Sequence, residues 1–440
     1  MVLSGCVLIS GDRALGKETH VRRPQAAVAA MTLGLTLGLV ACSGESGPPV
    51  LTWYINPDDG GQEEIAARCT EEAGGDYEIQ TSLLPRDASS QREQLARRLA
   101  ASDTSIDIMS LDPPFIPEMA AAGFLAPVPD NLQDTDDVVQ GAVDSATWDD
   151  ELVTVPFWAN TQLLWYRESV VEEAGLDMDE PVTWEQIMDA AAQTDTLLGV
   201  QGAKAESLTV WINALIASAG GEIITNPEAP ADEVQLGLDS DAGQEAAQIM
   251  SRIGQEGLAG PGFPTADENA SMNLFAGDNG SFMVNWPFVY PAISESDPDL
   301  IDDIGWTIYP QVDEGTEAAT PVGGINLGVS EFSDHVDLAY EAVECIVQPE
   351  NQSEYFVTNG NPPSSISAYD DAQVAEEFPM AETIRDSLDQ GVPRPQTPYY
   401  NEVSIGLQET WHPPAAIDPD TTPASSAEFI TAVLRDERLL

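Results

Sequence analysis

Short apolar runs alternate with amphipathic stretches along most of the chain. Residues 51–55, 77–84 and 106–111 are apolar or alternating runs bounded by turn residues, and they predict β-strands. Apolar residues at helical spacing follow the first run, and residues 91–99 follow the second, so helices are expected between the strands. This repetition is typical of an α/β fold in which helices cover both faces of a parallel sheet.

The same reading continues through the rest of the chain. Two pairs, Ser90 with Glu93 and Thr183 with Gln186, have the spacing of a capping box and predict helix starts. Further strands are expected at residues 152–155, 163–166, 281–286 and 321–327, and further helices at residues 208–219 and 336–347.

Polar residues at the strand ends are the first candidates for a site. Ligands of parallel α/β sheets bind outside the carboxyl ends of the strands. Asp58 lies in the turn after the first strand, and Asp112 ends the third strand before Pro113 and Pro114. The alternative for Asp112 is that it only caps the turn.

The first 41 residues have the features of an export signal. A basic pair precedes an apolar run from Ala26 to Ala41, which is shorter than the about 20 residues of a membrane-spanning helix. The run ends at Cys42 and resembles a bacterial lipobox, so we expect Cys42 to be lipidated and residues 42–49 to form a tether. The alternative is an ordinary cleaved signal with an incidental cysteine. Because residues 1–20 fit a signal poorly, the true start is expected near residue 21.

Charge and motifs exclude several classes of function. The chain has 75 acidic and 16 basic residues, with a net charge of −59, which disfavours nucleic acid and anionic membranes as partners. No phosphate-binding loop, dinucleotide fingerprint, nucleophile elbow or zinc-protease motif is present. The three histidines form no ligand cluster, so neither a metal nor a cofactor is expected, and the protein is predicted not to be an enzyme.

The cysteines outside the export signal are expected to pair. Besides Cys42, only Cys69 and Cys345 follow the signal, and an exported chain folds in an oxidising compartment, which favours a disulfide. Two buried free thiols remain the alternative.

Several segments resemble the solute-binding lipoproteins of carbohydrate ABC importers, and are most similar to the mycobacterial trehalose-binding members. The resemblance is carried by residues 91–99, 111–112, 160–167, 284–288 and 323–327. It implies a two-lobed periplasmic-binding-protein-like fold of the maltose-binding-protein type, with several hinge crossings and a ligand cleft between the lobes. Lobe 1 would comprise residues 50–158 and 321–373, and lobe 2 residues 159–320 and 374–440. Cys69 and Cys345 would then both lie on lobe 1.

The resemblance also implies a set of cleft residues, each with a plainer alternative. Glu268 lies 18 residues before Trp286, as the sugar-binding glutamate of the family does, although it would ordinarily be a surface acid. Trp286 offers an apolar face to a sugar ring, or is part of the core. Arg394 lies between two prolines, where a surface ion pair is the alternative. The full set of expected ligand-binding residues is Gln91, Asp112, Asn160, Glu268, Trp286, Arg394, Gly324 and Asp58, with Tyr400 as a weaker candidate.

These features together predict a binding protein without catalysis. The expected ligand is a disaccharide, most of all trehalose, and the expected partners are the permease subunits of an ABC importer. The protein is expected to be a monomer, lipid-anchored on the extracellular face of an actinobacterial membrane. Maltose or another α-glucoside is the alternative ligand, and an exported glycosidase or an adhesion scaffold would be an alternative function.

Overall fold

A six-stranded mixed sheet forms the first half of the fold. The structure is a computed structural model that describes residues 47–58 and 60–440. The strand order is β12-β11-β3-β1-β2, and β6 pairs with residues 322–327 of β11. The strands β1, β2 and β3 are parallel, as expected, but β11 runs antiparallel to β3 and β6. The strands are β1 Val50–Ile55, β2 Glu78–Leu83, β3 Ile108–Leu111, β6 Val155–Thr161, β11 Pro321–Val329 and β12 Val392–Pro393.

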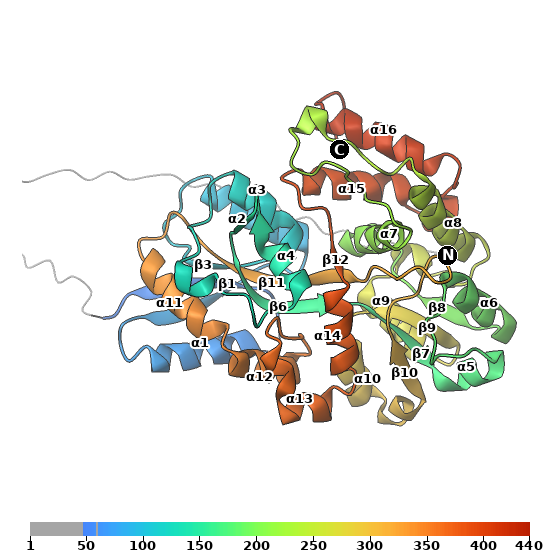
Figure 1. Ribbon diagram of the computed structural model, residues 1–440, viewed down its shortest axis with the longest axis horizontal. Helices are drawn as coiled ribbons and strands as arrows, with labels where there is room; N and C mark the ends of the chain where they lie inside the picture. The colour runs from blue at the N-terminus through green and yellow to red at the C-terminus, as the bar shows by residue number, and fades with distance from the viewer. Residues whose placement is uncertain (1–46, 59) are drawn as a thin grey trace, which may run out of the picture. The chain divides into compact units, whose positions relative to one another are not determined.

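Both faces of this sheet are covered by helices (Figure 1). Leu51, Trp53 and Ile55 alternate along β1 and pack with one group of helices, while Tyr54 points to the other side. Burial on both faces explains the nearly continuous apolar run of β1. The first group includes α1 Gly61–Glu72 and α11 Val336–Ile346, with α12 Pro349–Asn359 beside α1, and the second includes α2 Ala88–Leu99 and α3 Ile116–Ala121.

A separate four-stranded sheet, in the order β10-β7-β9-β8, forms the second half. Alternate residues of β7 enter different cores: Leu164 packs with α6, α7 and α8, whereas Trp165 packs with α10 and α14. The strands are β7 Leu163–Arg167, β8 Leu197–Gly199, β9 Gly280–Asn285 and β10 Ile304–Thr307. The helices are α6 Trp184–Thr194, α7 Glu206–Ser218, α8 Asp241–Gln255, α9 Glu268–Ala276, α10 Val289–Ser296, α15 Tyr400–Trp411 and α16 Thr422–Leu434. Helix α14 Ala381–Asp389 packs against β6 of the first sheet.

The chain passes between the two sheets three times in its described part. Strand β6 of the first sheet leads to β7 of the second through a single residue, Gln162. The chain returns over residues 308–320 into β11, and leaves again after β12 towards α15. The lobe boundaries expected from the sequence stay a prediction. The remaining elements are α4 Gln140–Ala146, β4 Thr147–Trp148, β5 Glu151–Leu152, α5 Glu168–Ala174 and α13 Ala372–Glu377.

Local expectations were met in some places and wrong in others. Thr183 and Gln186 form the expected capping box at the start of α6. The expected box at Ser90 is wrong, because α2 begins earlier and Asp87 is its N-cap, accepting a hydrogen bond from the Ser90 amide at 2.8 Å. Residues 156–161, expected to lie between strands, belong to β6 because they pair with β11.

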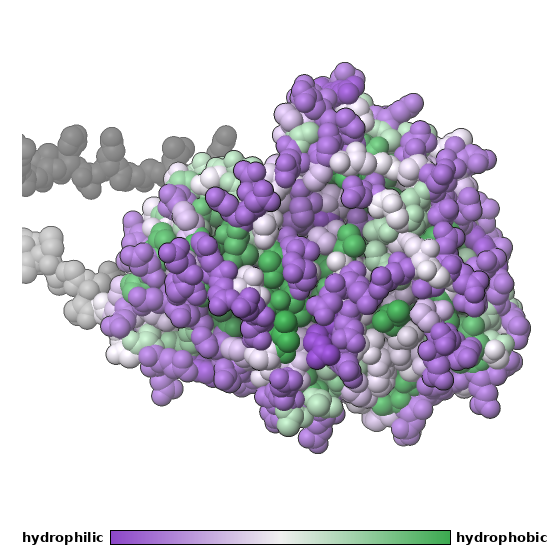
Figure 2. Space-filling view, viewed as in Figure 1, coloured by the Kyte–Doolittle hydropathy of each residue, from purple (hydrophilic) through white to green (hydrophobic). Residues whose placement is uncertain are grey.

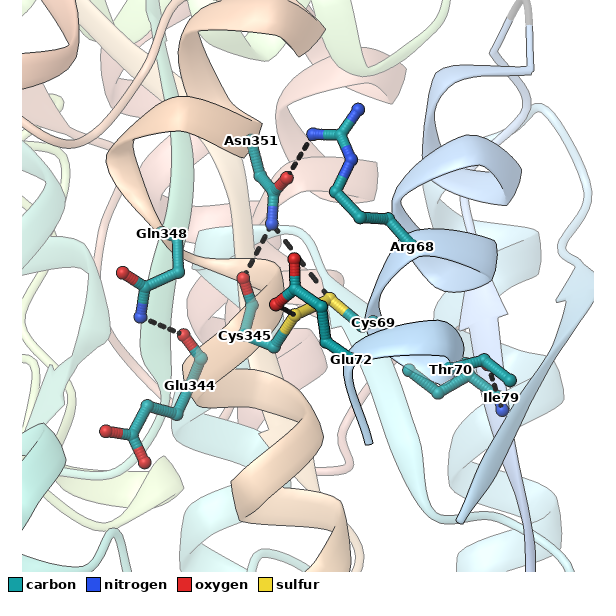
Figure 3. The surroundings of a disulfide bond; sticks show 9 residues. All are labelled: Arg68, Cys69, Thr70, Glu72, Ile79, Glu344, Cys345, Gln348 and Asn351. Carbon is teal, nitrogen blue, oxygen red and sulfur yellow. Dashed lines mark hydrogen bonds between the residues drawn. A yellow bond between two sulfur atoms is a disulfide. The ribbon is translucent and has the colours of Figure 1, made fainter. Parts of the chain in front are cut away.

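The disulfide between Cys69 and Cys345 is present, with a sulfur–sulfur distance of 2.04 Å. It joins α1 to α11, and Asn351 of α12 donates a hydrogen bond to the Cys345 carbonyl at 2.7 Å (Figure 3). The alternative of two buried free thiols is therefore wrong. The bond ties together two helices that cover the same face of the first sheet.

The face shown in Figure 2 is covered mostly by hydrophilic residues. This is the arrangement that an acidic, solvated surface requires. Within residues 47–58 and 60–440, no helix combines the length and the apolar composition needed to cross a bilayer. The expected export signal and the lipidation site Cys42 lie outside the described residues.

Candidate ligand-binding cleft

A cavity of about 440 Å³ lies between residues of the two halves of the fold, and we call it the inner cavity. Its volume falls in the range of about 300–1,000 Å³ that is usual for small-molecule sites. Strands β6 and β11 and the end of β3 contribute from the first sheet, whereas α7 and α9 contribute from the helices around the second. Seven of the eight ligand-binding residues expected from the sequence line it: Gln91, Asp112, Asn160, Glu268, Trp286, Gly324 and Arg394.

Arg394 is the centre of a buried ionic cluster, which we call the arginine cluster (Asp112, Glu206, Arg394, Tyr400 and Ser404). Its guanidinium donates to Asp112 Oδ1 at 2.5 Å and to Glu206 Oε1 at 2.7 Å. Only 6% of the Arg394 side chain is exposed. The plainer alternative of a surface ion pair is therefore wrong, because the pair is buried between a carboxylate that follows β3 and one at the start of α7.

Glu206 receives hydrogen bonds from three sides. Besides Arg394, the Tyr400 hydroxyl donates to Glu206 Oε1, and the Ser404 hydroxyl donates to Oε2 at 2.7 Å. Tyr400 does not line the cavity, and its role in the cluster is to hold Glu206. Glu206 and Arg394 are thus fixed by contacts within the protein.

Burial and charge oppose each other in this cluster. Burial raises the pKa of the Glu206 carboxyl, although the Arg394 charge and the Tyr400 hydrogen bond act to lower it. Burial would lower the pKa of Arg394, but the charges of Asp112 and Glu206 outweigh it, so that this pKa lies well above its ordinary value. Two carboxylates therefore share one guanidinium in a buried place.

Glu268 is a carboxylate without a cationic partner among the described residues. It is the first residue of α9, directly after the N-cap Asp267. Burial raises the pKa of the Glu268 carboxyl, and the neighbouring charges of Asp267 and Glu206 raise it further, while a hydrogen bond with the Trp286 side chain acts to lower it. Since Glu268 lines the cavity, its charge is available to a ligand.

Two glycines of β11 allow the cavity wall to form. A Cβ atom on Gly323 would lie 3.1 Å from the Trp286 ring, so the absent side chain lets this ring approach the strand. Gly324 has φ of +111°, and a Cβ there would lie 2.2 Å from the Trp158 carbonyl oxygen. Gly324 is therefore required by the backbone, whatever contact it makes with a ligand.

The loops after β1 and β2 are held by their own polar side chains. Gln91 accepts from Asn56 Nδ2 at 2.8 Å and donates to the Pro85 carbonyl at 2.7 Å. Asp58 accepts from the backbone amides of Gly60 and Gln62 at 3.1 and 2.9 Å, which fixes the start of α1. Asp58 lines a neighbouring cavity but not the inner one.

This neighbouring cavity, of about 420 Å³, continues from the first, and we call it the outer cavity. Arg86, Glu268, Trp286 and Phe288 are among six residues that line both cavities. The outer cavity adds a mainly polar set, which consists of Asp58, Asn269 and Asn359.

Several residues that line the inner cavity were not predicted from the sequence. Trp158 lies two positions from Asn160 on β6, so strand alternation alone places both on one face and could have identified it. Glu206 gave no such signal, because it is one of 75 acids and stands 188 positions from Arg394. Other polar or aromatic lining residues that were not predicted are Arg86, Asp87, Ser207, Phe288, Tyr355 and Asn361.

The cavity chemistry suits recognition of a polar ligand by hydrogen bonds. In the described part of the chain, no three histidine, cysteine, aspartate or glutamate side chains are grouped to hold a metal ion. Carboxylates, amides and an arginine supply donors and acceptors, while Trp158, Trp286 and Phe288 supply apolar surface.

Solved structures of sugar-binding proteins share this fold. Maltose-bound MalE3 of T. maritima superposes with a TM-score of 0.74 and 22% identity, over 88% of this chain and 99% of that one. The GacH receptor of Streptomyces glaucescens, solved unliganded and with acarbose, gives a TM-score of 0.74 and 18% identity, over 89% and 98%. The fold is thus that of the maltose-binding proteins, as expected from the sequence.

Sequence relatives come from several bacteria. A probable ABC transporter-binding protein of Deinococcus radiodurans is 26% identical over 58% of this chain and 62% of its own length. A galactooligosaccharide-binding protein of Bacillus subtilis is 20% identical over 84% and 87%. The chain spans about three fifths of the length of the first of these relatives. Residues 56–353 match the family described as bacterial extracellular solute-binding protein, and the chain belongs to this family, whose members bind substrates and are not enzymes.

Proposed function

We propose that this protein captures a disaccharide, with trehalose as the first candidate, and delivers it to the permease of an ABC importer. The observation that carries the proposal is the inner cavity, which combines carboxylates, amides and one arginine with tryptophan faces. A neutral sugar has many hydroxyls and no charge, so it needs donors and acceptors in number, with an apolar surface for its ring.

Family membership supports the transport role, and the names of some relatives support a sugar as ligand. The Bacillus subtilis relative is described as binding galactooligosaccharide, and MalE3 was solved with maltose. The choice of trehalose rests on the sequence resemblance alone. Attachment to the outer face of the membrane through Cys42 is part of the proposal, as is a monomeric state.

A thermal-shift screen of the purified protein against disaccharides tests the proposal, followed by calorimetric titration of the sugars that stabilise it. Trehalose should raise the melting temperature, and maltose should do so less. If only maltose raises the melting temperature, maltose and not trehalose is the ligand. If no sugar binds, or if the sugar is hydrolysed, the proposed function is wrong.

Trp286→Ala is the matching site variant. Removing the ring takes apolar surface from the cavity and admits water, so trehalose affinity should fall at least tenfold, which corresponds to about 1.4 kcal/mol. Circular dichroism should show a folded protein, since Trp286 lies at the cavity and outside the apolar cores. Parent-like binding by the folded variant would remove Trp286 from the site.

A further inference from the structure

The disulfide lies near one end of both α1 and α12, and the two cavities lie at the other end of these helices. Cys69 belongs to α1 and Cys345 to α11, and Asn351 of α12 donates to the Cys345 carbonyl (Figure 3). Arg68, the neighbour of Cys69 on α1, donates to Asn351 Oδ1 at 2.5 Å and forms an ion pair with Glu354. The disulfide and these contacts together hold α1, α11 and α12 against one another.

On α1, one face leads from the disulfide to the loop after β1. Gln62 and Cys69 are about two helical turns apart, so their side chains lie on the same face of α1. The buried Gln62 side chain donates to the Asn56 carbonyl at 2.9 Å and to Asp58 Oδ2 at 3.0 Å. Asn56 lines the inner cavity and Asp58 lines the outer one, so α1 positions both loop residues.

On α12, Asn351 and Tyr355 are about one helical turn apart and share a face. The buried Tyr355 lines the inner cavity, and its hydroxyl accepts a hydrogen bond from Asn361 Nδ2 at 3.1 Å. A Cβ atom on Gly61 would lie 2.6 Å from the Tyr355 ring, so α1 and α12 meet closely at this point. The two helices are therefore in contact both beside the disulfide and at the cavity wall.

We propose that the disulfide is a positioning element of the ligand site, which holds α1 and α12 in the relative position at which Asn56 and Tyr355 shape the inner cavity. This role rests on the proposed function, because its effect is on ligand affinity. A disulfide stabilises a protein mainly by restricting the unfolded chain, and that effect leaves the affinity of folded molecules unchanged. Loss of positioning instead lowers the affinity of molecules that remain folded.

The test compares the parent with a Cys69→Ser, Cys345→Ser double variant, using trehalose and maltose as probes. Calorimetric titrations are made well below the melting temperature of each protein. The affinity for the sugar that the parent binds should fall about five- to tenfold in the double variant, because the cavity wall is no longer preorganised. The control is Ile253→Val in the core around the second sheet, which lowers the melting temperature, lines neither cavity and should bind like the parent.

A second variant keeps the disulfide and removes its link to α12. Asn351→Ala loses the hydrogen bonds with Arg68 and with the Cys345 carbonyl, so sugar affinity should fall about two- to fivefold. Gln348→Ala is the matched control, because the exposed Gln348 side chain donates only to the Glu344 carbonyl of α11, and it should bind like the parent. In both the double variant and Asn351→Ala, amide hydrogen exchange should be faster than in the parent over residues 60–66 and 355–361, and unchanged in α8.

The outcomes separate this inference from the proposed function. Parent-like affinity in the folded double variant and in Asn351→Ala would overturn the positioning role while sugar binding stands. An equal loss of affinity in Ile253→Val would also overturn it, because the loss would then follow from lower stability. A parent protein that binds neither sugar would overturn the proposed function. Unchanged hydrogen exchange over residues 60–66 and 355–361 would then overturn the positioning role as well, and faster exchange there would support it.

Discussion

The arginine cluster and the outer cavity use charge in opposite ways. In the cluster, Arg394 is 6% exposed and holds two carboxylates from the two halves of the fold. In the outer cavity, Arg86 is exposed and pairs with no described carboxylate. A buried cation such as Arg394 needs carboxylates within the protein because it has lost its contact with water. An exposed arginine is solvated, so its donors can exchange water for a ligand. Arg394 is therefore part of the folded architecture, whereas the Arg86 side chain is available for recognition.

The largest expected effect is the loss of stability in Arg394→Met, which tests whether the arginine cluster stabilises the fold. Removal of the guanidinium leaves Asp112 and Glu206 buried without their cation, which typically costs about 3–5 kcal/mol of the free energy of unfolding. The urea midpoint of the variant should fall accordingly. The control is Arg97→Met, which changes an exposed ion pair, and its free energy of unfolding should stay within about 0.5 kcal/mol of that of the parent.

A compensated variant sharpens the same test. Replacing Asp112 with Asn and Glu206 with Gln in the Arg394→Met background removes the uncompensated charges, so part of the lost stability should return. An Arg394→Met protein that unfolds at the urea concentration of the Arg97 control would mean that the cluster does not stabilise the fold.

Glu268→Gln should separate stability from binding at the junction of the two cavities. Burial raises the pKa of Glu268, so the folded protein holds this proton more tightly than the unfolded chain does. Stability therefore falls as the pH rises from the ordinary glutamate range through the raised pKa. The amide removes this loss, so the melting temperature of the unliganded variant should exceed that of the parent at neutral pH.

Sugar affinity should change in the other direction. Without the carboxylate, hydroxyl donors lose a charged acceptor, and binding at neutral pH should weaken about tenfold. Melting curves and titrations between pH 4 and 8 measure both effects, with Glu64→Gln on the exposed part of α1 as control. A lower melting temperature with unchanged affinity would contradict the assignment of Glu268 to the ligand.

The smallest effect is expected for Gly323→Ala, which changes the shape of the cavity and no charge. The added methyl would lie 3.1 Å from the Trp286 ring, so the ring must shift by a few tenths of an ångström. We expect a two- to fivefold loss of disaccharide affinity with the fold retained. Gly262→Ala, where a Cβ meets open space, is the control, and equal affinities in the two variants would show that the ring position is not critical.

The sequence predicted those parts of the site that depend on local pattern. Asp112 follows a strand and precedes two prolines, and the structure places it in the cavity. Glu206 could not be predicted, because its partner Arg394 is distant in sequence and only the crossing after β12 brings them together. Asp58 was placed at a strand end correctly, but its carboxylate is used by amides of α1, which pattern alone does not reveal.

Strand assignment had the same limit. Residues 156–161 start with a proline and end with polar Asn160 and Thr161, so they do not resemble a buried strand. Pairing with β11, a partner far along the chain, decides their conformation. Register with a distant strand is tertiary information and outweighs local preference.

The disulfide closes a large part of the chain into a covalent loop. Cys69 and Cys345 are 276 positions apart, and all four strands of the second sheet lie between them. The second sheet therefore lies within one covalently closed loop, which also contains β2, β3, β6 and β11 of the first sheet. A protease that cuts one bond anywhere in this loop leaves the two fragments joined, so the nick is visible only after reduction.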